Sequence, residues 1–166
     1  MKYILTLLLA TPLFGAAQIC KLKKETDQFS QQPKLSTGFM SMLAKGTRIS
    51  LNMVADNKEV KLLFSLGDGT CFDDQSTAIF SFDSSRTKST QRNSSAMNCD
   101  GIFTIIFRNA ATTPSALQKM TLQKISSIIL TDNTKKKIEI SLKEDEKKLI
   151  LEKATCLVNE AKALIK

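Results

Sequence analysis

The residues best suited to chemistry in this sequence are its cysteines, and their spacing argues against a metal site. The chain contains four cysteines and no histidine. No two cysteines form a Cys-x-x-Cys motif, so a tetrahedral zinc site would have to collect all four from distant segments. An even number of cysteines instead predicts a set of disulfide bonds if the protein is exported. The four residues are Cys20, Cys71, Cys99 and Cys156.

The sequence context of the cysteines favours one of the three possible pairings. Cys71 follows an Asp-Gly turn and Cys99 precedes one, and each adjoins an apolar run. A Cys71–Cys99 bond would clasp two neighbouring strands, and a Cys20–Cys156 bond would tie the entering chain to a C-terminal helix. In this interpretation the cysteines fasten the fold and take no part in a reaction.

Aspartates crowd the turns around the two central cysteines and are the other candidates for chemistry. They could form an acidic pair for hydrolysis or bind calcium, but aspartate before glycine is ordinary turn chemistry. The chain also has no histidine base, no Gly-x-Ser-x-Gly elbow and no phosphate loop. We therefore predict no catalytic residue, no metal site and no cofactor, and keep a small metal-dependent hydrolase as an alternative. The aspartates concerned are Asp68, Asp73, Asp74, Asp83 and Asp100.

The N-terminus is typical of a secretory signal peptide. Lys2 supplies a positive start, a short apolar run follows, and small residues precede a cleavage site that we place after Ala17. The apolar run is too short to span a bilayer. We predict a signal peptide at residues 1–17 and a single exported domain at 18–166, periplasmic or secreted, with no membrane span. Lipidation of Cys20 is a minor alternative, because the residue before it is not small.

The formal net charge is +8, and two segments concentrate the basic residues. Such a surface can attract an anionic glycan or an anionic lipid. The first segment, residues 83–98, is rich in serine, threonine and asparagine, and we predict a mobile polar loop there. The second is a run of three lysines. The candidate anion contacts are Arg86, Lys88, Arg92, Lys135, Lys136 and Lys137.

Aromatic residues restrict the kind of ligand. The chain has no tryptophan, and its only tyrosine, Tyr3, lies in the predicted signal peptide. A carbohydrate site that stacks sugars on tryptophan or tyrosine is therefore disfavoured. We also predict no nucleic-acid binding, since an exported protein has little need of it.

Hydrophobic alternation predicts a series of strands after an entering segment, residues 19–34, with little structure. Gly101–Arg108 is so apolar that we expect it to be buried on both faces. A helix begins at Pro114 and ends near Leu122, and Ser141 with Glu144 forms a capping box for a longer C-terminal helix. The helix stripe comprises Ile150, Ala154, Leu157, Ala161 and Leu164. The other expected strands are Gly38–Ala44, Thr47–Ala55, Glu59–Leu66, Ser76–Phe82, Lys124–Thr131 and Lys136–Leu142.

These elements predict an α+β fold. We expect an antiparallel sheet of six or seven strands with a short helix and a longer C-terminal helix. A β-sandwich or an open barrel with a terminal helix is the alternative.

Three motifs in this order resemble a family of small exported proteins of Bacteroides-like bacteria. They are "DQFS" with Asp27 and Phe29, "LLFSLGDGT" from Leu62 to Thr70, and "SALQKMTLQKISSIIL" from Ser115 to Leu130. In the last motif Leu117, Met120, Ile125 and Ile128 match the family's apolar spacing, whereas Ser30-Gln31 departs from its entry motif. The family is largely uncharacterised, so the resemblance implies an exported location and a style of fold, and carries no catalytic residues.

The predicted function is that of a non-enzymatic exported domain, binding or structural, in the cell envelope. Its partner would be a protein or another envelope component. The alternatives are the hydrolase that uses turn aspartates and an electrostatic binder of anionic glycan or lipid.

Overall fold

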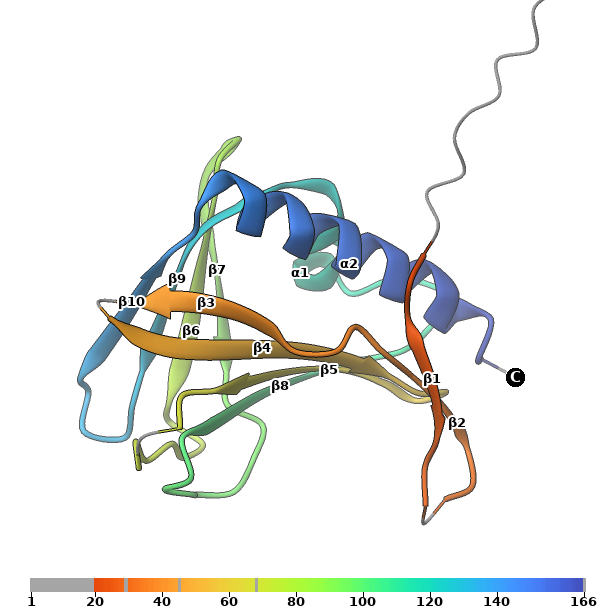
Figure 1. The fold of residues 1–166 in the computed structure, drawn as a ribbon, viewed down its shortest axis with the longest axis horizontal. Coiled ribbons are helices and arrows are strands. Elements are labelled where there is room, and N and C mark those ends of the chain that lie inside the picture. The colour runs from red at the N-terminus through yellow and green to blue at the C-terminus, as the bar shows by residue number, and fades with distance from the viewer. Residues whose placement is uncertain (1–19, 29, 45, 68, 166) are drawn as a thin grey trace, which may run out of the picture.

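The computed structural model describes residues 20–28, 30–44, 46–67 and 69–165. Within these residues the chain forms two antiparallel sheets, of six and four strands, and two helices (Figure 1). This confirms the predicted α+β class, with the strands divided between two sheets. The predicted signal peptide lies outside the described residues.

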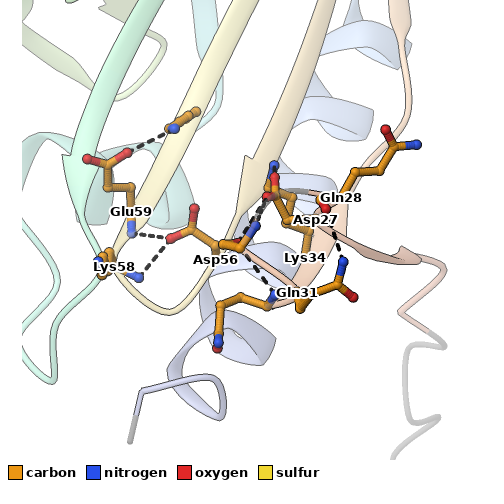
Figure 2. A network of polar contacts seen from close by, with 10 residues as sticks. Asp27, Gln28, Gln31, Lys34, Asp56, Lys58 and Glu59 are labelled. Carbon is orange, nitrogen blue, oxygen red and sulfur yellow. Dashed lines mark hydrogen bonds and ion pairs between the residues drawn. The ribbon is translucent and has the colours of Figure 1, made fainter.

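The larger sheet has the order β1-β2-β4-β5-β8, and β3 also pairs with β4. Strands β4 and β5 alternate between buried and half-buried residues, as their sequence predicts. Their connecting turn forms because Oδ1 of Asp56 accepts the backbone N–H groups of Lys58 at 2.7 Å and Glu59 at 2.8 Å (Figure 2). The strands are β1 Lys23–Thr26, β2 Pro33–Ser36, β3 Met40–Ala44, β4 Thr47–Ala55, β5 Glu59–Ser65 and β8 Ile102–Arg108.

The smaller sheet has the order β10-β9-β6-β7. Strand β10 lies alongside β3, so the two sheets come together at that edge (Figure 1). The strands are β6 Thr77–Phe82, β7 Ser85–Arg92, β9 Ile125–Thr131 and β10 Lys137–Ser141.

Two segments that we expected to be irregular contain strands. The predicted loop at residues 83–98 holds β7, which pairs with β6 over most of its length. The entering segment holds β1 and the start of β2, which form a hairpin whose turn is stabilised by an ion pair between Asp27 and Lys34 (Figure 2). Both predictions were wrong for the same reason: these strands bury few side chains, and backbone pairing with a neighbour holds them in place.

Four phenylalanines join the two sheets through the core. Phe64 on β5 lies 6.3 Å from Phe80 on β6 and 6.3 Å from Phe103 on β8, measured between ring centroids. Phe72 packs edge-on against Phe103 at 5.2 Å. All four side chains are fully buried, so the region between the sheets is a continuous apolar core.

Both helices lie on the same side of the molecule (Figure 1). Helix α1, Ser115–Leu122, packs on helix α2, Glu144–Lys162, and α2 also contacts β2, β4 and β9. The predicted stripe of α2 is buried up to Ala161, whereas Leu164 is half-buried and lies beyond the helix end.

The predicted helix starts need correction. Helix α2 is capped at Lys143 and not at Ser141, and the Glu146 carboxylate accepts the Lys143 backbone N–H at 2.8 Å. Helix α1 begins one residue after Pro114, which occupies the capping position. Ser141 is unavailable as a cap because β10 extends through it.

Strand β8 lies at the end of the larger sheet and is not buried on both faces as predicted. Ile102 and Ile106 are 37% and 38% exposed. The free edge of β8 is covered by polar side chains: Asn93 Oδ1 accepts the Thr104 N–H at 2.9 Å, and Ser94 Oγ accepts the Ile106 N–H at 3.2 Å. Covering an edge in this way prevents unwanted strand pairing.

Candidate functional site

Both predicted disulfides are present, Cys71–Cys99 and Cys20–Cys156. Cys71 precedes Phe72, which exchanges two backbone hydrogen bonds with Asn98 at 2.8 and 2.9 Å, so the bond clasps a short antiparallel pair. The Cys20 bond attaches the entering chain to the middle of α2. A cysteine in a disulfide bond has no thiol available for a lipid, which argues against lipidation of Cys20.

The turn aspartates do not assemble into one site. Asp73 and Asp83 lie at opposite ends of β6, and Asp83 forms an ion pair with Lys147 at 3.2 Å. Asp83 therefore does not lie with the aspartates in the turns around the two central cysteines. Asp74 and Asp100 are exposed, and Asp68 lies outside the described residues. In the described part of the chain, no group of three or more histidine, cysteine or acidic side chains could hold a metal ion.

Asp73 has a structural role in its own turn. Its carboxylate accepts hydrogen bonds from the Ser76 hydroxyl at 2.9 Å and from the Gln75 N–H at 3.0 Å. The Ser76 hydrogen bond is the main reason why the pKa of Asp73 lies below its usual value of 3.8. An aspartate that remains ionised and turns its oxygens to its own backbone is suited to holding a loop.

The outer face of the four-stranded sheet collects basic and hydroxyl side chains. On β6, Ala78 and Phe80 are buried in the core, so the alternate residues point outward. Strand register then sets outward residues side by side across the strands. One register row, which we call the basic row, consists of Lys137, Thr131, Thr77 and Arg92; the next consists of Glu139, Ile129, Ile79 and Thr90.

The turn between β9 and β10 presents the three consecutive lysines. Asp132 is buried, and its Oδ1 accepts the backbone N–H groups of Thr134 and Lys136, both at 2.9 Å. The neighbouring Asn133 donates its N–H to the Cys71 carbonyl at 3.1 Å, so the turn is anchored to the disulfide-bonded loop. These contacts use the backbone of the turn and leave Lys135, Lys136 and Lys137 exposed.

A cleft of about 240 Å³ adjoins the basic row at Lys137. It lies where β10 approaches the hairpin of β3 and β4. Its polar lining comes from hydroxyls and lysines, with one acid. The lining residues are Ala44, Thr47, Leu66, Thr70, Lys136, Lys137, Ile138 and Glu139.

The six predicted anion contacts are only partly brought together. Lys137 and Arg92 share the basic row, and Lys135 and Lys136 adjoin it, whereas Arg86 lies at the far end of β7. None of the six forms an ion pair with a carboxylate of the described residues. Apart from Lys135, whose charge helps to lower the pKa of Asp73, these cations have no acidic partner among the described residues and retain their capacity to bind an anion.

Sequence reasoning missed the hydroxyl residues of this surface. Thr77 and Thr131 lie between the two cations of the basic row, and Thr47 and Thr70 line the cleft. The alternation in β6 and β9 indicated outward threonines, but only the register shows that they are neighbours.

No model of a known protein family matches this chain, and no curated protein or solved structure is significantly similar to it. Among the helices of the described residues, none has the length and apolar character needed to cross a membrane.

Proposed function

We propose that this protein is a non-enzymatic exported domain that binds an anionic glycan of the cell envelope. The observation that carries the proposal is the continuity of the basic row with the cleft at Lys137. Together they offer lysine, arginine and threonine groups that have no acidic partner among the described residues. Ammonium and guanidinium groups would bind phosphate or carboxylate substituents, and the threonine hydroxyls would bond to sugar hydroxyls.

The composition of this face favours a glycan over a lipid surface. A membrane-binding face needs exposed apolar side chains that enter the headgroup region. The large exposed apolar side chains of the described residues lie off this face: on or beside β3, on β8 and the loop before it, and on the two helices. Ile79 and Ile129, at the centre of the outer face, are only half-exposed. The face thus offers no large exposed apolar side chain that could enter a bilayer.

The disulfides support an exported location. Bonds of this kind form and persist in oxidising compartments, such as the periplasm and the extracellular space. An envelope glycan would be accessible to the protein in either place.

Titration with a polygalacturonate oligomer tests the proposal, with neutral dextran and phosphatidylglycerol vesicles as comparison ligands. The Lys136→Gln/Lys137→Gln variant should bind the oligomer roughly tenfold more weakly, because it lacks two charge-assisted contacts. A matched Lys24→Gln/Lys58→Gln variant removes the same charge from exposed sites on the other sheet and should bind normally. If both variants bound the oligomer equally weakly, the binding would depend on the net charge of the protein and not on this site. Tighter binding to the vesicles than to the oligomer would contradict the proposal that the ligand is a glycan.

A further inference from the structure

Strand β7 presents a row of backbone groups that no neighbouring strand uses. The Asn93 N–H donates to the Ser76 carbonyl at 2.9 Å, which shows that Asn93 and Ser76 form a hydrogen-bonded pair at the end of the β6–β7 ladder. In an antiparallel ladder the hydrogen-bonded residues alternate. Gln91 and Ser89 therefore turn their N–H and C=O groups toward β6, whereas Thr90 and Arg92 turn theirs away. These outward groups have no hydrogen-bond partner in the described part of the chain.

Two other strand edges are occupied. The edge of β8 is occupied by Asn93, Ser94 and Asn98, and β3 lies against β10. The beginning of β7 is irregular, because the β6–β7 register shifts between Phe80 and Phe82, and there the Lys119 ammonium donates to the Thr87 carbonyl at 2.9 Å. The uncovered stretch of β7 is thus residues 88–92, long enough to pair with a short strand.

We propose that residues 88–92 of β7 accept an extended acidic segment of a partner protein as an added strand. In this mode of recognition the backbone supplies the affinity and alternate side chains supply the specificity. Lys88 and Arg92 flank Thr90 on the outer face, and neither has an acidic partner among the described residues. A segment with acids at alternate positions would place its carboxylates beside these cations.

The charge pattern argues against two other occupants. If a second copy of this chain paired its own β7 antiparallel about Thr90, Lys88 of one copy would lie opposite Arg92 of the other. Like charges placed directly opposite destabilise a strand pair. Residues 1–19 contain no aspartate or glutamate, so they do not have the required charge. An acidic segment of a different protein satisfies both the backbone and the side chains.

The added strand would share Arg92 with the proposed glycan surface, but its backbone pairing does not depend on glycan binding. The glycan contacts at Lys136 and Lys137 lie at the β10 side of the sheet, and the added strand uses the backbone of β7 at the opposite edge. Either interaction can therefore fail while the other holds.

The test uses a fluorescent nine-residue peptide that alternates glutamate with valine. Thr90→Pro removes one outward N–H, and proline is tolerated at edge positions whose N–H faces solvent. We expect at least a tenfold loss of peptide affinity in Thr90→Pro, unchanged affinity in Thr90→Val, and unchanged polygalacturonate binding in both. Unchanged peptide binding by Thr90→Pro would overturn the proposal.

A second probe decides the matter if Thr90→Pro is unstable. The same peptide with N-methyl groups on alternate amides keeps its charge but cannot pair along one edge. The wild-type protein should bind it at least tenfold more weakly than the parent peptide. The proposal would be overturned if the parent peptide and both methylated peptides, one blocked along each edge, bound with equal affinity. It would also be overturned if a peptide that alternates lysine with valine bound as tightly as the parent peptide.

Discussion

Arg92 on β7 and Lys137 on β10 lie in one register row of the four-stranded sheet, with Thr77 and Thr131 between them. Three strand spacings separate the two cations by about 14 Å. Their relative position is set by backbone pairing, and neither side chain has an acidic partner in the described residues. A ligand with several negative charges can therefore contact both.

The separation of these two cations predicts additive effects on glycan binding. Arg92→Gln and Lys137→Gln should each weaken polygalacturonate binding about fivefold, and the double variant about 25-fold, because sites this far apart act independently. Calorimetric titration at two salt concentrations measures both effects, and each single variant should show a smaller salt dependence than the wild type. A double variant no weaker than either single variant would place the ligand elsewhere.

The two disulfides should contribute unequally to stability. The Cys20–Cys156 bond closes a sequence separation of 136 residues, and the Cys71–Cys99 bond closes one of 28. Loop-closure entropy predicts losses of about 5 and about 4 kcal/mol when each pair is replaced by serine. Urea unfolding of the Cys20→Ser/Cys156→Ser and Cys71→Ser/Cys99→Ser variants measures the difference.

A larger loss for the shorter loop would show that native contacts, and not chain entropy, dominate the stabilisation. Such contacts are present at the shorter loop, since the Asn133 N–H bonds to the Cys71 carbonyl at 3.1 Å. The Asn133 side chain can be replaced without removing that bond, so Asn133→Ala serves as a control that should change stability little.

Because Asn93 covers the edge of β8, its replacement should lower the stability of the fold. Asn93 is buried, accepts the Thr104 N–H at 2.9 Å and donates to the Asp73 carbonyl at 3.0 Å. Asn93→Ala would leave the Thr104 N–H without its partner and remove one of two hydrogen bonds to the Asp73 carbonyl, which also accepts the Ser76 N–H at 3.2 Å. The variant should lower the free energy of unfolding by about 1–3 kcal/mol. Asn93→Asp keeps an acceptor for Thr104 but places a buried carboxylate against the Asp73 and Ser95 carbonyls, so it should not recover the loss. Denaturant titration compares the variants, and a loss below about 0.5 kcal/mol would contradict this role.

The turn at Asp73 predicts a dependence of stability on pH. Since the pKa of Asp73 is lowered from 3.8 in the folded state, its stabilising effect is present above that value and is lost as the pH falls through the lower folded value. Asp73→Asn should therefore be less stable than the wild type near neutral pH, and the difference should shrink below about pH 3.8. Thermal melting across this range measures it, with the exposed Asp74→Asn as control. A constant difference between wild type and Asp73→Asn would contradict the assignment.

Much of the fold could be predicted from local patterns. The alternation in β4 and β5 follows directly from residues such as Ile49, Leu51 and Phe64, which are buried at every second position. The disulfide pairing followed from the matching turn contexts of Cys71 and Cys99. Both signals are contained within a few residues of sequence.

What could not be predicted depends on pairing between distant segments. Strand β7 has no apolar face, and its partner β6 alone makes it a strand. The basic row likewise needs the register of Thr77 with Thr131 and Arg92, which no local pattern contains. The cations of the candidate site were therefore predicted as residue types, whereas their arrangement was not.

The most direct measurement is an amide chemical-shift titration of the ¹⁵N-labelled protein with a polygalacturonate oligomer. Shifts that saturate at Thr77, Thr131, Lys136 and Lys137, with little change along α2, are the predicted result. Shifts confined to α2 or to the six-stranded sheet, or no saturable shift at all, would contradict glycan binding on the outer face of the four-stranded sheet.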